Sequence, residues 1–249
     1  MCGRFLLIAP AETLRRLFQA KGSPNLAARY NIAPTQGSAV IRVAAEGGRE
    51  LVLLRWGLIP SWAGDAASGP LLINARAESA AVKPSFREAF RRRRCLAPAD
   101  WFYEWRAPAS GKGAKQPYLI ARRDGATLAF AGLWERWQGA DGVAIESFAI
   151  VTTEANAALQ SIHPRMPAIL EPSDHAAWLD PANTLAGELL RPAPEDALQA
   201  TAISGRVNSV ANDGPEVVAP GTVEAGAPAP AAKLRAEPPA APPAQGSLL

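Results

Sequence analysis

Residues 118–152 read YLIARRDGATLAFAGLWERWQGADGVAIESFAIVT and carry the clearest sign of the fold class. They contain three runs rich in apolar, β-branched and aromatic residues, at 118–122, 127–134 and 145–152. The pairs Asp124-Gly125 and Asp141-Gly142 separate these runs, and an Asp-Gly pair between two strands is typical of a β-hairpin. The stretch therefore predicts a meander of antiparallel strands.

Further strands and helices are expected on both sides of this meander. Apolar patterns predict strands at 2–8, 38–43, 50–56 and 200–210, and one strand in the aromatic run that begins at Cys95 and ends with Glu104 and Trp105. Residues 29–36 are interpreted as a polar loop. Helices are expected at 10–18, where Gly22 would stop the helix, and at 84–93 and 154–161, and two further helices are expected within roughly 173–190. Because strands and helices do not alternate strictly, we predict an α+β fold. It is a single domain built around a curled antiparallel sheet or β-barrel-like core with flanking helices.

The end of the chain differs in composition. From about Pro215 onward the aromatic residues disappear, and alanine, proline, glycine and glutamate dominate. Such a segment has too little apolar surface to offset its ordering entropy. We therefore predict a folded domain over residues 1–220 and a disordered Ala/Pro-rich tail over 221–249.

Composition excludes several classes of protein. The chain has 249 residues, a net charge of +3 and two cysteines, which is too few for a disulfide framework and fits a reducing cytoplasm. Arg15, Arg16 and Lys21 interrupt the only early apolar run, and no stretch is long enough to span a membrane. No Cys/His cluster has metal-ligand spacing, and no glycine-rich phosphate loop is present, so we expect neither a metal nor another cofactor.

The first residues carry the most distinctive chemistry. Removal of Met1 would leave Cys2 with a free α-amine and a thiol on adjacent carbons. This 1,2-aminothiol condenses with an aldehyde to an imine, and the thiol then closes a thiazolidine ring. Both groups are largely protonated at neutral pH, so such a site needs an acid/base partner. The alternative is an incidental small residue after the start codon.

Two other side chains are candidates for that partner. His163 lies in a loop-like stretch and is a better acid/base candidate than His175, which begins a predicted helix, although the pattern also fits a structural histidine. Glu104 follows three aromatic residues, where a carboxylate is either paired with an arginine or has a raised pKa. Trp56 is expected in the core, whereas Trp62 fits either a core position or a stacking platform. The run of four arginines at 91–94 is interpreted in part as a solvated helix face.

Nine short motifs, taken in order, resemble the SOS response-associated peptidase family from residue 2 to about 220. Each motif is short, but the ordered set is specific. The motifs are Met1-Cys-Gly-Arg-Phe5, Arg29-Tyr-Asn-Ile-Ala-Pro-Thr35, Arg55-Trp-Gly-Leu-Ile-Pro60, Ile73-Asn-Ala-Arg-Ala-Glu78, Arg94-Cys-Leu-Ala-Pro-Ala-Asp-Trp-Phe-Tyr-Glu-Trp105, Phe130-Ala-Gly-Leu-Trp134, Phe148-Ala-Ile-Val-Thr-Thr153, Ile162-His-Pro-Arg-Met-Pro167 and Val207-Asn-Ser-Val210.

This resemblance implies a sensor and shield of abasic sites in single-stranded DNA. Its members form a covalent thiazolidine crosslink between the N-terminal cysteine and the ring-opened sugar, within a β-barrel-like fold that has a positively charged groove. The resemblance implies a monomer that binds single-stranded DNA and works in the cytoplasm at the nucleoid. By motif, the catalytic residues would be Cys2, Asn74, Glu104 and His163, and the DNA-binding residues would be Arg4, Arg76 and Trp105.

Two other functions remain open on the sequence. In the first, Cys2 is the nucleophile of an N-terminal-nucleophile cysteine peptidase that cleaves peptides or removes its own Met1. In the second, the chain is a non-covalent single-stranded DNA-binding module that is indifferent to Cys2. Exposure to abasic DNA and to peptide substrates separates these three functions.

Overall fold

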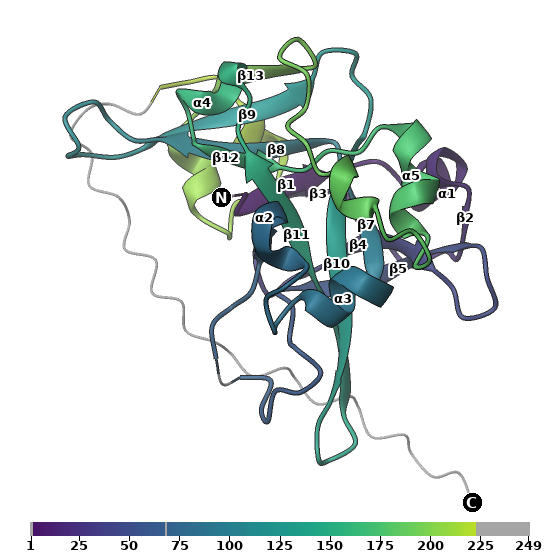
Figure 1. Cartoon of the computed structure of the whole chain (residues 1–249). Helices are drawn as coiled ribbons and strands as arrows, with labels where there is room; N and C mark the ends of the chain where they lie inside the picture. The colour runs from purple at the N-terminus through teal and green to yellow at the C-terminus, as the bar shows by residue number, and fades with distance from the viewer. Residues whose placement is uncertain (1, 68, 223–249) are drawn as a thin grey trace, which may run out of the picture.

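The computed structural model describes residues 2–67 and 69–222, so residues 223–249 of the predicted tail lie outside the described part (Figure 1). This part contains thirteen strands and five α-helices. The strands are β1 (Arg4–Leu7), β2 (Ala20–Lys21), β3 (Arg29–Ile32), β4 (Gly37–Val43), β5 (Arg49–Trp56), β6 (Asn74–Arg76), β7 (Arg94–Ala99), β8 (Trp101–Arg106), β9 (Gln116–Arg122), β10 (Leu128–Gln138), β11 (Ala144–Glu154), β12 (Arg165–Pro167) and β13 (Leu198–Ala202). The helices are α1 (Ala11–Phe18), α2 (Ala77–Ala80), α3 (Arg87–Arg92), α4 (Ala157–Gln160) and α5 (His175–Leu179), with short 3₁₀ turns at η1 (Pro172–Asp174), η2 (Ala186–Leu189), η3 (Gly205–Asn208) and η4 (Pro215–Val218).

Five strands close into a barrel. Antiparallel pairs join β11 to β10, β10 to β7, β7 to β4 and β4 to β5. Strand β5 then returns to β11 in a parallel pair, which closes the ring. The predicted α+β fold with a barrel-like core is confirmed, and the barrel is mixed because of this one parallel contact.

A second sheet, in the order β13-β9-β8-β1-β3, packs on the barrel through aromatic side chains. Phe5 of β1 meets Trp56 and Phe130 of the barrel, with ring centroids 5.0 and 6.0 Å apart. Phe102 of β8 meets Phe130 at 5.8 Å. Edge-to-face pairs of this kind add to the stability that the buried area already provides. They also bring β1 and β8 close to the barrel.

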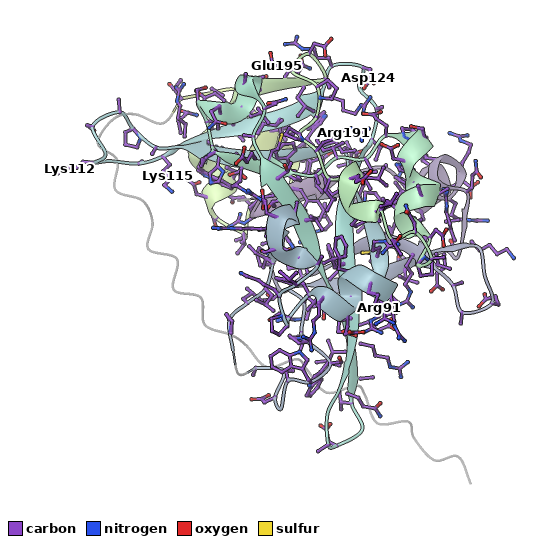
Figure 2. The ribbon with its side chains drawn as sticks, viewed as in Figure 1. Arg91, Lys112, Lys115, Asp124, Arg191 and Glu195 are labelled. Atoms are coloured by element: carbon purple, nitrogen blue, oxygen red, sulfur yellow. The ribbon has the colours of Figure 1, made fainter. Side chains whose placement is uncertain are left out.

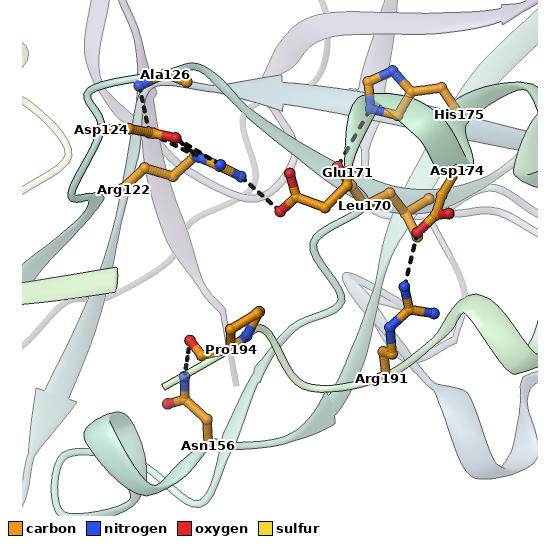
Figure 3. Close-up of polar contacts among 10 residues, drawn as sticks. All are labelled: Arg122, Asp124, Ala126, Asn156, Leu170, Glu171, Asp174, His175, Arg191 and Pro194. Carbon is orange, nitrogen blue, oxygen red and sulfur yellow. Dashed lines mark hydrogen bonds and ion pairs between the residues drawn. The ribbon is translucent and has the colours of Figure 1, made fainter. Parts of the chain in front are cut away.

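Half of the predicted meander is confirmed. Strands β10 and β11 form a hairpin around Asp141 and Gly142. The expected hairpin at Asp124 is wrong, because β9 pairs with β8 and β13 while β10 lies in the barrel. The Asp124 carboxylate instead accepts hydrogen bonds from Arg122 and from the backbone of Ala126, and Arg122 also donates to Glu171 (Figure 3). These contacts stabilise a crossover between the sheets.

The aromatic run also divides between the sheets. The expectation of a single strand ending at Glu104 and Trp105 is wrong, because β7 and β8 are separate strands that meet at Asp100. One Asp100 carboxylate oxygen accepts hydrogen bonds from the backbone N–H groups of Ile8 and Ala9, at 2.7 and 2.9 Å. A carboxylate that satisfies two backbone donors holds the chain where it changes sheet.

Two other expectations are wrong in their details. The polar loop expected at 29–36 begins with β3, which pairs with β1 and donates the N–H groups of Tyr30 and Asn31 to Asp213. The strand expected at 200–210 ends at Ala202, and η3 follows. In both cases the C-terminal segment, residues 203–220, sets the local conformation. Asp213 accepts the N–H groups of β3, and the backbone N–H of Ser204 donates to the carbonyl of Ala219. That segment is itself anchored, since Val217 in η4 is buried.

Helix α1 confirms the expected amphipathic helix, with Leu14 and Phe18 buried. It ends at Phe18, as expected, but Gln19 rather than Gly22 adopts the left-handed conformation (φ 51°) that terminates the helix. The next two residues then form β2 beside β5. Of the helices in the described ranges, none is both long and apolar enough to cross a membrane.

The four arginines at 91–94 have different environments. Arg94 is buried and donates to the backbone carbonyls of Trp178 and Phe90, and Arg93 donates to Glu135 at 2.8 Å. Arg91 and Arg92 are exposed (Figure 2 labels Arg91). The interpretation as a solvated helix face therefore holds for the first two arginines, whereas the last two tie α3 to its neighbours.

Trp56 and Trp62 also differ in their environments. Trp56 is fully buried, as expected, whereas 66% of the Trp62 surface is exposed. Trp62 lies in the loop between β5 and β6 and donates a long hydrogen bond of 3.4 Å to the carbonyl of Pro84. The core position is therefore excluded for Trp62.

The environment of His175 predicts that the protein loses stability at acidic pH. The His175 ring stacks on that of Phe18, with centroids 5.3 Å apart. Its Nε2 lies 3.3 Å from the carbonyl oxygen of Leu170 (Figure 3). Burial lowers the pKa of His175 below the usual 6.5. The unfolded state therefore binds the proton more readily, so stability falls as the pH drops below about 6.5. We expect His175→Phe to show a smaller fall in unfolding free energy between pH 7.5 and 5.5 in urea titrations. An equal fall in both proteins would assign the acid sensitivity to other groups.

Candidate active site

Cys2 lies at the centre of the candidate site. Its side chain is fully buried in the main core, where it clusters with Phe5 and Leu7. The Asn74 side-chain nitrogen donates to the backbone carbonyl of Cys2 at 2.9 Å. The other end of that amide, Asn74 Oδ1, is buried and has no hydrogen-bond partner among the described residues. The structure therefore brings together two predicted residues that are 72 positions apart, with one acceptor oxygen unused.

Glu104 is the carboxylate of this site. The side chain of Glu104 is almost fully buried, and this burial raises its pKa to about 7, against opposing effects of the Trp105 backbone N–H and the Lys115 charge. Burial also raises the pKa of the Cys2 thiol, and the negative charge of Glu104 raises it further. A carboxyl group that titrates near neutrality beside a thiol can both accept and donate a proton at pH 7.

His163 lies two residues before the start of β12 and is partly buried. Its Nδ1 is 3.0 Å from the backbone nitrogen of Arg165 and 3.0 Å from the backbone oxygen of the same residue. Burial lowers the pKa of His163, and the positive charges of Lys115 and Arg165 lower it further. The imidazole is therefore largely neutral at physiological pH.

Lys115 is a residue that the sequence did not single out. It is exposed at the end of the loop between β8 and β9, and Figure 2 shows it beside Lys112 at that edge of the molecule. Its charge acts on the pKa values of both Glu104 and His163, so it lies near both groups. No motif marked Lys115, because its place follows from the pairing of Arg106 with Gln116 in the β8–β9 hairpin.

The predicted DNA-binding residues are distributed over two faces. Arg76 is exposed at the end of β6, two residues after Asn74, so both side chains point to the same side of that strand. Arg4 and Trp105 instead face the smaller core formed with Tyr103 and the C-terminal segment. The structure therefore groups Cys2, Asn74 and Glu104, with Arg76 nearby, and separates Arg4 and Trp105 from them.

The Val207-Asn-Ser-Val210 motif anchors Arg4 and Trp105. The Arg4 Nη1 donates to Asn31 Oδ1 at 2.8 Å and to the carbonyl of Val207 at 2.7 Å. The Trp105 indole nitrogen donates to Asn208 Oδ1 at 2.8 Å. Asn208 thus fixes the orientation of the partly buried indole, a role that the motif contained but that no local pattern revealed.

No group of three or more His, Cys, Asp or Glu side chains within residues 2–67 and 69–222 is placed to bind a metal ion.

The fold and this site together define a class of single-domain α+β barrel proteins in which the second residue, a cysteine, lies beside asparagine and glutamate side chains. The chain belongs to the SOS response associated peptidase family, which matches residues 1–210. The resemblance carried by the nine motifs is thereby confirmed.

Named relatives and solved structures agree with this membership. The abasic site processing protein YoqW of Bacillus subtilis is 38% identical over 225 residues, which cover 88% of this chain and 99% of the relative. The abasic site processing protein HMCES of Mus musculus is 29% identical and covers 88% of this chain and 76% of its own length. A crystal structure of a protein from Bacteroides thetaiotaomicron has a TM-score of 0.78 at 27% identity, covering 87% of this chain and 98% of its own. A protein from Bordetella bronchiseptica has a TM-score of 0.71 at 31% identity, with coverages of 82% and 100%.

Proposed function

We propose that this protein captures abasic sites in single-stranded DNA through a thiazolidine crosslink to Cys2. The observation that carries the proposal is the buried Glu104 carboxyl, whose pKa of about 7 makes it a proton acceptor and donor beside the Cys2 thiol. The relatives named abasic site processing proteins support the substrate. A protein with this function would act at the nucleoid in the cytoplasm.

The proposed reaction releases one water. After removal of Met1, the neutral amine of Cys2 adds to the aldehyde carbon of the ring-opened sugar, and the resulting hydroxyl group leaves as water to give an imine. The thiol sulfur then adds to the imine carbon, and the thiol proton ends on the ring nitrogen. The thiol needs a base at this step because burial keeps it protonated at neutral pH.

Each nearby group has a proposed task. Glu104 takes a proton from the amine or the thiol as that group attacks. His163, which is neutral at the outset, accepts the proton of the sugar's ring hydroxyl as the ring opens and returns a proton to the hydroxyl group that leaves as water. Asn74 holds the backbone of Cys2 through its nitrogen, and its unused oxygen is available to accept from the attacking amine. Arg76 and Arg4 bind phosphates that flank the lesion, and Trp105 offers a surface on which a base stacks.

Intact mass is the direct test. Purified protein exposed to a single-stranded oligonucleotide with one abasic site is expected to gain the mass of that oligonucleotide minus one water. An oligonucleotide with a reduced abasic sugar, which has no aldehyde, is the matched control and should add no mass. Equal non-covalent retention of both oligonucleotides without any mass gain would contradict the proposal and favour a plain binding module. Cleavage of added peptides would favour the peptidase.

Arg76 should contribute to the salt dependence of binding. Each phosphate contact on a single strand contributes roughly −0.7 to the slope of log K against log salt concentration. We expect Arg76→Gln to make this slope shallower by about 0.7 in fluorescence anisotropy with an intact oligonucleotide. Arg16→Gln removes the same charge from the exposed surface of α1 and should leave the slope unchanged. Equal slopes for the two variants would exclude the assigned contact.

A further inference from the structure

An ion pair between Glu78 and Arg165 crosses β11, the strand that lies between the segments carrying the proposed catalytic residues Asn74 and His163. Arg165 donates from Nη1 and Nη2 to the two carboxylate oxygens of Glu78, at 2.6 and 3.0 Å. Its Nη2 also reaches the backbone oxygen and the hydroxyl of Thr152, at 2.5 and 3.3 Å. A bidentate pair with two further contacts fixes the guanidinium in one orientation.

The strand topology shows what this pair connects. Thr152 of β11 is paired with Arg76 of β6 and with Pro167 of β12, so these two short strands lie on opposite sides of β11. Strand β6 carries Asn74 and continues into α2, which carries Glu78. The Glu78–Arg165 pair therefore joins the segment that holds Asn74 to the segment that holds His163.

The same arginine also holds the imidazole of His163. When the ring is neutral, the Arg165 backbone N–H donates to Nδ1 and the ring proton lies on Nε2. When the ring is charged, Nδ1 donates to the Arg165 carbonyl oxygen, which is also 3.0 Å away. The Arg165 backbone therefore provides a hydrogen-bond partner for His163 Nδ1 in both protonation states of the ring. The position of the ring follows the position of Arg165.

We propose that Glu78 is a positioning residue, which holds Arg165 so that His163 and Asn74 keep a fixed geometry for the capture of the abasic sugar. This inference rests on the function proposed above. About half of the Glu78 side chain is exposed, and exposed ion pairs contribute little to stability. Its contribution is therefore geometric, since small displacements of a catalytic group have large effects on rate.

The test compares Glu78→Gln with Glu154→Gln. Glu154 is exposed and lies opposite Arg165 in the β11–β12 ladder, so its replacement removes the same charge nearby without breaking the ion pair. We expect Glu78→Gln to slow adduct formation about 10-fold, with little change in melting temperature. Glu154→Gln should react at the parent rate. In a His163→Asn background, adding Glu78→Gln should slow the reaction by clearly less than about 10-fold, because the part of the effect that passes through His163 is already lost and only the part through Asn74 remains.

A second measurement needs no DNA. The chain has only two histidines, so NMR titration resolves His163 readily. We expect Glu78→Gln to shift the His163 titration and its Nδ1 resonance, and Glu154→Gln to leave both unchanged. Identical titrations and rates in these two variants would overturn the positioning role. If the parent protein forms no adduct, the proposed function fails, and the titration alone decides whether Glu78 sets the state of His163.

Discussion

Replacement of Cys2 by alanine is expected to abolish the covalent adduct with abasic DNA. Alanine retains the amine and so still permits an imine, but it has no sulfur to close the ring. Imine formation is reversible, whereas the thiazolidine has a second bond to the same carbon. We expect no adduct after denaturing electrophoresis of the Cys2→Ala variant unless borohydride is present, because borohydride reduces the imine to a stable amine.

Cys95 provides the matched control for this experiment. It is equally buried, and burial likewise raises the pKa of its thiol, but Gly132 packs directly against its sulfur. The nitrogen of Cys95 lies in a peptide bond, so this residue cannot form the thiazolidine. Cys95→Ala should therefore form the adduct at the parent rate, with some loss of stability from the cavity. Loss of the adduct in Cys95→Ala and its retention in Cys2→Ala would reassign the nucleophile.

A variant with additional residues before Cys2 tests the amine independently. A peptide nitrogen cannot form an imine, so such a protein should fold normally but form no adduct, even with borohydride. Parent-level crosslinking by the extended protein would remove the thiazolidine route.

The second large effect is expected at Glu104 and His163. Replacement of Glu104 by glutamine, or of His163 by asparagine, removes a proton-transfer group while keeping a polar side chain. We expect each change to slow adduct formation by roughly 10²-fold or more, the usual scale for a lost acid or base. The measurement is the single-turnover rate from pH 5 to 9. The rise of the parent rate as Glu104 ionises around pH 7 should be missing in Glu104→Gln.

Stability separates this catalytic role of Glu104 from a structural one. Its pKa rises from 4.5 to about 7 on folding, so the folded state resists ionisation. Stability is therefore unaffected below about pH 4.5 and is lost as the pH rises towards 7, at a cost of up to about 3 kcal/mol. Glu104→Gln should match the parent at pH 4 and be more stable at pH 8. A variant that is slower yet more stable indicates a group retained for chemistry, whereas lower stability at both pH values would indicate a structural role.

Local patterns in the sequence were sufficient for several features. The amphipathic helix of α1, the hairpin of β4 and β5, and the turn at Asp141 depend on neighbouring residues alone, because helical spacing, strand alternation and turn chemistry are short-range. The reactive pair at Cys2 is equally local, since the amine and the thiol belong to one residue.

The assembly of the site depended on contacts between distant segments. The Asp-Gly pair at Asp124 predicts a hairpin, but in the structure the chain crosses there from one sheet to the other. Arg122 donates to the Asp124 carboxylate, and β9 and β10 pair with strands of different sheets. The pKa of Glu104 follows from its burial, which its own flanking residues do not determine. The position of Lys115 near Glu104 and His163 follows from the β8–β9 register. Burial and electrostatic fields are sums over neighbours in space, and those neighbours exist only once the barrel has closed.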